Sequence, residues 1–78
     1  MKNLDESTLF YIADQLSNSM EFYTEEEFIS HISSETNLTP TEVQKIWNGY
    51  YDLSVVERMN LGWNIEDTYE QITDWVNS

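Results

Sequence analysis

The chain has 78 residues, and its fifteen Asp and Glu residues face only three cations, Lys2, Lys45 and Arg58, so its formal net charge at pH 7 is -12. This excess of negative charge repels phosphate and favours basic partners, which argues against nucleic acid as a direct ligand. The length suits one domain, residues 1–78, and the absence of cysteine excludes disulfides and thiolate chemistry.

Hydrophobic residues make up 40% of the chain and include three Trp, five Tyr and three Phe, which is enough to build a core despite the charge. We therefore expect a folded domain and not a disordered segment. The apolar runs are too short for a membrane span or a signal-peptide core, so we expect a cytoplasmic protein without membrane contact.

The first segment predicts a helix over residues 5–19 because its apolar residues recur at helical spacing. These residues are Leu9, Ile12, Ala13, Leu16 and Met20. A second helix is predicted to begin after Thr24 as N-cap, with Glu27 closing a capping box and Tyr23 packing on Phe28. Its inward residues are Phe28, Ile29 and Ile32, and Asn37 is expected to end it in a left-handed conformation.

The third helix has the strongest start signal in the chain. Thr39 is the predicted N-cap, Pro40 takes the first helical position, Glu42 closes the box and Leu38 packs on Val43. The pattern leaves two alternatives for residues 40–60. One is a single helix whose buried side is Val43, Ile46, Trp47, Tyr50, Leu53, Val56 and Met59. The other is a break near Asn48 and Gly49 followed by a short helix capped by Ser54 and Glu57.

A last amphipathic helix is predicted after a stop at Gly62 and a cap at Asn64. Its inward residues are expected to be Ile65, Tyr69, Ile72 and Val76. No alternating stretch predicts a strand. The fold class predicted is therefore all-α, a small compact bundle of four helices, or five if residues 40–60 divide.

Residues 24–52 have the spacing of a helix-turn-helix pair. Ser33 is a small residue where the helices cross, Asn37 lies in the turn, and Leu38, Val43 and Ile46 anchor the second helix. The segment also resembles the N-terminal helical hairpin of HU-type histone-like proteins, with residues 36–39, Thr-Asn-Leu-Thr, in place of that family's T-G-L-T turn. The resemblance implies a hairpin only, because the basic β-arms that hold DNA in that family have no counterpart after Gly62.

If this pair contacted DNA, the polar residues on the outer side of its second helix would reach the bases. They are Thr39, Thr41, Gln44, Lys45 and Asn48. Positioning on a duplex takes several Lys or Arg contacts to phosphates, and this helix supplies one. DNA binding would therefore need a dimer or the help of a partner.

The last predicted helix carries an acidic face that consists of Glu66, Asp67, Glu70 and Asp74. Three of these carboxylates follow one another at intervals of four residues and so form one stripe, with no Lys or Arg to offset their repulsion. The sharper hypothesis is that this face binds a basic protein surface by imitating nucleic acid. The simpler one is that the stripe is a solvated face that keeps the protein soluble.

No motif points to catalysis, to a metal or to a cofactor. His31 is the single histidine and has no Cys or second His with which to bind a metal, so a structural role is expected. The function predicted is a non-enzymatic acidic protein acting by protein–protein contact, with a nucleic-acid-handling protein as one class of partner. The alternative is a helix-turn-helix regulator of DNA, and a plain structural subunit is a third reading.

Overall fold

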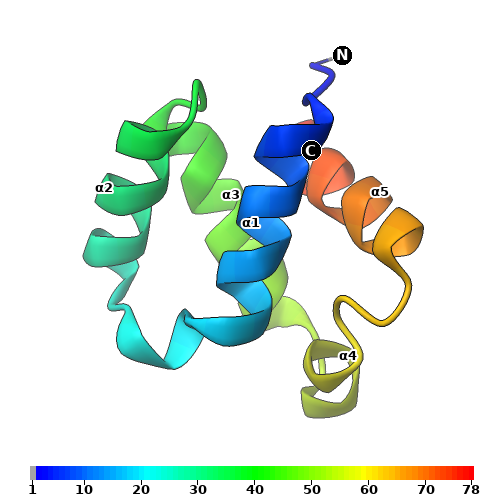
Figure 1. Cartoon of the computed structure of the whole chain (residues 1–78). Coiled ribbons are helices and arrows are strands. Elements are labelled where there is room, and N and C mark those ends of the chain that lie inside the picture. The colour runs from blue at the N-terminus through cyan, green and yellow to red at the C-terminus, as the bar shows by residue number, and fades with distance from the viewer. Residues whose placement is uncertain (1) are drawn as a thin grey trace.

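The computed structural model describes residues 2–78, and over this range it contains five α-helices, one short 3₁₀ helix and no strand (Figure 1). The elements are α1 (Glu6–Asn18), η1 (Met20–Phe22), α2 (Glu25–Glu35), α3 (Pro40–Asp52), α4 (Val55–Met59) and α5 (Ile65–Val76). The predicted all-α class is confirmed, with the larger of the two helix counts.

Each α-helix begins where a side chain accepts a hydrogen bond from the backbone amide three residues later. These N-cap residues are Asp5, Thr24, Thr39, Ser54 and Asn64. Capping boxes are completed at three of them, by Glu27, Glu42 and Glu57. The box at Ser54 decides between the two alternatives for residues 40–60. Extended backbone at Leu53 ends α3, and a separate helix, α4, starts after Ser54.

The end of α2 differs from the prediction for Asn37. No residue other than glycine has a positive φ in the described chain, so Asn37 is not left-handed. Thr36 ends the helix instead, in an extended conformation. Its hydroxyl donates to the Ile32 carbonyl at 2.7 Å and accepts from the Leu38 amide at 3.2 Å. Because this hydroxyl pairs a carbonyl at the helix end, no left-handed residue is needed there.

Gly49 does not interrupt α3, contrary to one of the alternatives, and lies within it at the contact with α5. A Cβ atom at this position would lie 2.5 Å from three atoms of the Trp75 ring. Glycine therefore lets the backbone of α3 approach the Trp75 side chain closely. Gly62, by contrast, has a φ of 94°, which glycine adopts readily, and its amide donates to the buried Thr68 hydroxyl at 2.9 Å.

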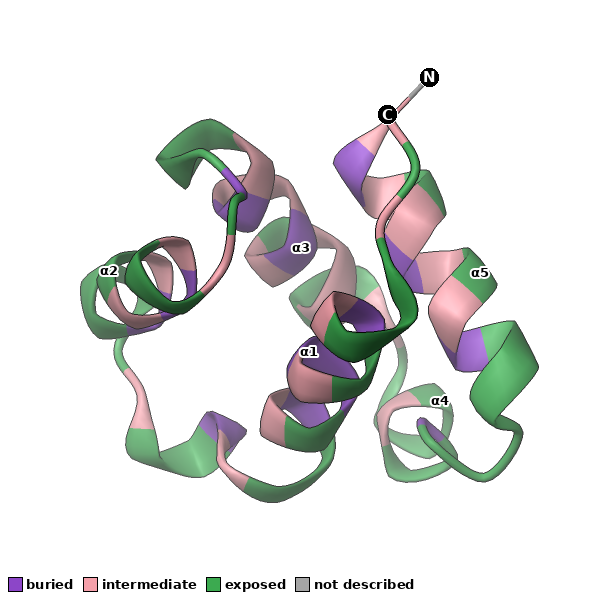
Figure 2. Ribbon diagram, turned by 45° about the horizontal axis from the view of Figure 1, so that its top comes forward, coloured by how far each residue is buried: buried purple, intermediate pink, exposed green. Residues whose placement is uncertain are grey.

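The core lies between four helices, because α3 packs on both α2 and α5, and α5 also packs on α1 (Figure 2). Ile12, Ile46 and Ile72, on α1, α3 and α5, are fully buried. The remaining core residues are Leu9, Ala13, Leu16, Met20, Phe28, Ile32, Leu38, Val43, Leu61 and Val76. Most residues predicted to face inward therefore do so.

Three residues predicted to face inward are exposed instead: Val56, Met59 and Ile65. For Val56 and Met59 the reason is the break between α3 and α4. The periodicity of α3 does not continue past Leu53, and none of the five residues of α4 is buried. Ile65 is the first residue of α5, one position after the N-cap, where the helix has not yet reached the core.

The two ends of the described chain lie side by side (Figure 1). The Asn77 side chain accepts from the Lys2 amide at 2.6 Å and donates to the Lys2 carbonyl at 2.8 Å. The Lys2 ammonium also forms a salt bridge of 2.9 Å with Glu42 at the start of α3. The N-terminal segment is thereby fastened to both α3 and α5.

Gly49→Ala should lower the free energy of unfolding by about 1–3 kcal/mol, the usual cost of overpacking. This net loss is expected even though alanine gains up to about 1 kcal/mol as a helix former. The measurement is urea denaturation followed by circular dichroism. Asn48→Ala is the control, since the exposed neighbouring residue should change stability by less than about 0.5 kcal/mol. A Gly49→Ala protein as stable as the wild type would contradict the close approach of α3 to Trp75.

The pKa of Glu42 is lowered from its ordinary value near 4.5, first by the hydrogen bond from the Thr39 amide and then by that from Lys2. Since the pKa is lower in the folded state, the charged form stabilises the fold above the unfolded pKa. That contribution is lost as the pH falls through the folded pKa.

Glu42→Gln should therefore cost up to about 1 kcal/mol of unfolding free energy at neutral pH, because glutamine keeps the capping bond but loses the charge. The cost should disappear in acid, once Glu42 of the wild type is protonated. Urea denaturation at both pH values measures it, with Glu21→Gln as a control that should change little at either, because Glu21 is exposed, lies outside the α-helices and makes no side-chain hydrogen bond in the described chain. An equal cost at both pH values would contradict a role for the charge.

Candidate partner-binding surface

The negative charge of the chain lies on its outside. Every Asp and Glu is exposed except Glu42, which is half-buried beside Lys2. Within residues 2–78 the Lys2–Glu42 contact is the one salt bridge. The other carboxylates therefore have no cation of the described chain to neutralise them, and the outward display of charge expected from the composition is present.

The remaining two cations do not form a basic patch. The Arg58 guanidinium lies 5.8 Å from the ring centre of Tyr50 and 5.5 Å from that of Tyr51, in cation–π geometry. Lys45 is half-buried and lines a shallow hollow with Asp52 and Trp75. No part of the described surface therefore brings several Lys or Arg residues together for a phosphate backbone.

The predicted acidic face lies on the solvent side of α5. Glu66, Asp67, Glu70 and Asp74 are all exposed, whereas Thr68, Ile72 and Val76 on the opposite side are buried. The four carboxylates make no side-chain hydrogen bond within residues 2–78. We call these four residues the α5 acidic face. The core fixes their positions, because α5 is anchored by its buried side.

The three acids at the start of α2 differ from the α5 acidic face, because two of them form hydrogen bonds within the fold. Glu27 closes the capping box of Thr24, and Glu25 accepts a hydrogen bond from the side-chain amide of Gln44 on α3. Glu26 makes no side-chain hydrogen bond in the described chain. All three also lie near the positive end of the α2 dipole, which stabilises them.

The segment predicted as a helix-turn-helix pair folds as the two packed helices α2 and α3, and side-chain contacts occupy much of the outer side of α3. Of the five residues predicted as DNA-contacting, Thr41 and Asn48 are exposed, Lys45 is half-buried and Thr39 holds the cap of α3. Gln44 is held between Glu25 and Asn48, donating to Asn48 at 3.1 Å. Reading a base with Gln44 would break these bonds and bring Glu25 towards the phosphates, which is unfavourable.

Four exposed apolar residues close together in the chain are the feature that the sequence did not predict. They are Val55, Val56 and Met59 on α4 and Trp63 in the loop that follows, and we call them the α4 patch. Trp63 is 86% exposed and Met59 is 73% exposed. The capping box at Ser54 was the signal available, since a five-residue helix that starts there cannot continue the buried side of α3.

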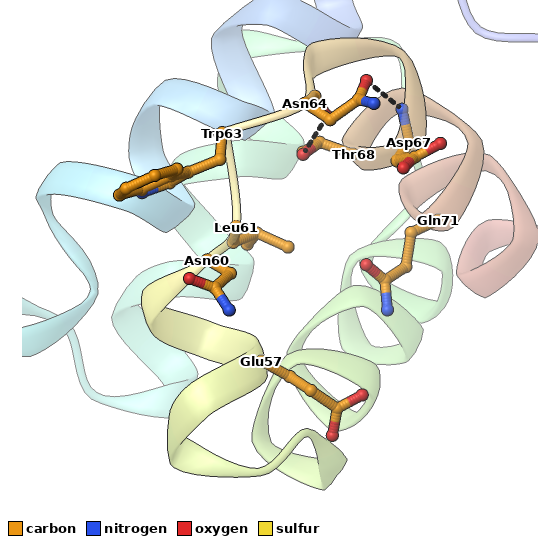
Figure 3. A pocket seen from close by; sticks show the side chains of 8 residues that line it. All are labelled: Glu57, Asn60, Leu61, Trp63, Asn64, Asp67, Thr68 and Gln71. Carbon is orange, nitrogen blue, oxygen red and sulfur yellow. Dashed lines mark hydrogen bonds between the residues drawn. The ribbon is translucent and has the colours of Figure 1, made fainter.

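Two surface hollows adjoin the patch and share Leu61 in their lining. One lies between α4 and the start of α5 and is lined by Glu57, Leu61, Trp63, Asp67 and neighbouring polar residues. Figure 3 shows Leu61 pointing into this hollow, with Glu57 on one rim and Asp67 on the other, while Trp63 extends away from it. The second runs between α4 and α1, and its lining includes Val55, Met59 and Leu16.

His31 has the structural role that was expected. It is half-buried, its Nε2 lies 2.7 Å from the Tyr11 hydroxyl, and its ring stacks on Tyr23 with centres 5.6 Å apart. Burial is the main cause that raises the pKa of Tyr11. Within residues 2–78 no three His, Asp or Glu side chains come together in a way that could hold a metal ion.

No protein-family model, curated protein or solved structure matches this chain. None of the helices in residues 2–78 is long and apolar enough to cross a membrane. No related protein helps to locate the binding surface, so the candidate surface rests on the residues described above. It comprises the charged α5 acidic face and, beside the start of that helix, the α4 patch.

Proposed function

We propose that this chain is a non-enzymatic binding protein that docks its α5 acidic face on a basic surface of another protein. One observation carries the proposal: four exposed carboxylates on one anchored helix take part in no hydrogen bond or salt bridge of the described chain. Like charges at this spacing cost a helix a few tenths of a kcal/mol per pair. A basic partner would relieve that cost on binding.

The class of partner that suits this face is a protein whose basic surface otherwise holds nucleic acid. Glu66, Glu70 and Asp74 follow one another at a rise of about 6 Å along α5, which makes a regular row of anions. A groove that neutralises phosphates with Lys and Arg attracts such a row by the same electrostatic force. The chain would then act by occupying the groove and excluding the nucleic acid.

The test is reversal of charge on the α5 acidic face. Glu66, Glu70 and Asp74 are replaced together by lysine, and the variant and wild type are used as bait in a lysate of the source cells. We expect the wild type to retain a basic protein that increasing salt or excess duplex DNA releases, and the variant to retain none. The variant should fold normally, because all three side chains are exposed.

The control carries the same change of charge on other elements. Glu21, Glu26 and Glu35 are exposed and make no side-chain hydrogen bond in the described chain, so their replacement by lysine should weaken capture much less. Equal loss in both variants would show that net charge alone acts. Unchanged capture by the α5 variant would remove the proposal.

The alternative function, a helix-turn-helix regulator, has the packed pair α2 and α3 in its favour, with Thr41 and Asn48 exposed on α3. It predicts that the chain shifts labelled duplex DNA in an electrophoretic assay. It also predicts that Gln44→Ala with Lys45→Ala abolishes the shift. Our proposal predicts no shift by the wild type at physiological salt, so a shift that this double variant loses would favour the regulator.

A further inference from the structure

We propose that the α4 patch is the apolar anchor site for a cationic amphipathic helix of the partner protein. The inference rests on the proposed function and deepens it, because it adds an apolar requirement to the basic one. Of the eight large hydrophobic residues that are exposed in the described chain, five fall within residues 55–65. Such clustering differs from the scattered apolar residues found on ordinary surfaces.

The fold itself does not account for this clustering. None of the residues of α4 is buried, so Val55, Val56 and Met59 contribute little to the core. Leu61 holds the segment to the body, and Arg58 packs on Tyr50 and Tyr51. The side chains that hold α4 in place are thus separate from those that it exposes.

The charges around the patch select the occupant. Glu57 and Asp67 line the hollow beside Trp63, and Glu66 adjoins Ile65. The one nearby cation, Arg58, lines the hollow between α4 and α1, where its guanidinium lies over the rings of Tyr50 and Tyr51. A second copy of the chain would bring another net charge of -12 to this rim, and an anionic lipid surface would be repelled as well. A segment that carries both Lys or Arg and apolar residues complements the site.

The shape favours a helix. Val55 and Met59 are four residues apart and line the hollow between α4 and α1, and Leu61 joins that hollow to the one beside Asp67. Apolar residues spaced three or four apart on a partner helix can enter the hollow between α4 and α1, as in helix-in-groove recognition, and the mostly polar hollow beside Asp67 can take polar side chains of that helix. Lysines on the flanks of that helix would meet Glu57 and Asp67, and the remaining charge would reach the α5 acidic face.

The probes are two synthetic helical peptides of equal length and charge, one built from lysine and leucine and the other from lysine and alanine. Binding to the full chain is measured by calorimetry and by tryptophan fluorescence. We expect the leucine peptide to bind at least about tenfold more tightly than the alanine peptide and to shift the emission of the exposed Trp63 to shorter wavelength. Equal affinity for the two peptides would overturn the inference.

Two variants locate the apolar contribution. Met59→Ala combined with Trp63→Ala should weaken binding of the leucine peptide by about tenfold or more and leave binding of the alanine peptide almost unchanged. Phe22→Ala is the matched control, since Phe22 is 73% exposed but lies on η1. No loss in the double variant, or an equal loss in Phe22→Ala, would overturn the inference. So would a dimer of the chain in sedimentation equilibrium that the double variant abolishes.

The two proposals fail in different ways. Suppose that the triple lysine variant of the α5 acidic face binds neither peptide, while the Met59→Ala, Trp63→Ala double variant binds both as the wild type does. The proposed function then stands and the anchor site is ruled out. If the triple variant binds both peptides normally and the double variant no longer binds the leucine peptide, the anchor site stands and the proposed function is ruled out.

Discussion

The structure depends on the core between α1, α2, α3 and α5, because this small core must hold together a chain that repels itself. Ile12, Phe28, Ile46 and Ile72, one from each of these helices, are fully buried there, and Gly49 lets the Trp75 ring lie against the backbone of α3. Almost all carboxylates lie outside it, where water and salt reduce their repulsion. The apolar core and the charged surface are therefore separated in space.

The carboxylates are of two kinds, and the difference bears on function. Asp5, Glu27, Glu42 and Glu57 bond to helix starts, where the dipole and the backbone amides favour a negative charge. Hydrogen bonds from the Thr8 side chain and then its amide lower the pKa of Asp5, and hydrogen bonds from the Thr39 and Ser54 amides are the main cause that lowers the pKa of Glu42 and Glu57. Glu70 and Asp74 lie beyond the first turn of α5 and have no such role, so they are surplus to the fold. Surplus charge on an anchored helix is what a basic partner can use.

The sequence predicted helix starts better than any other feature, since a cap is formed by residues within one turn of each other. The boxes at Thr24 and Thr39 formed as predicted, and Tyr23 packs on Phe28 with ring centres 5.8 Å apart. The end of α2 was predicted wrongly because a hydroxyl can replace a left-handed residue. The place of Gly49 could not be predicted, since it depends on Trp75, far away in the chain.

The two parts of the candidate surface differ in how far local sequence determines them. The α5 acidic face was predicted because both the charges and their helical spacing can be read directly from the sequence. The α4 patch was missed because Val56 and Met59 continue the apolar spacing of α3 in the sequence. The helix itself ends at Leu53, and both side chains are exposed to solvent. Whether an apolar residue is buried depends on what the fold brings against it.

In the function proposed, α5 together with α4 meets the partner, and the outer side of α3 does not. The most direct measurement is an NMR titration of the labelled chain with its captured partner, recording backbone amide shifts residue by residue. The account predicts that the largest changes fall within residues 55–74. Largest changes at residues 39–48, with α4 and α5 unaffected, would contradict it.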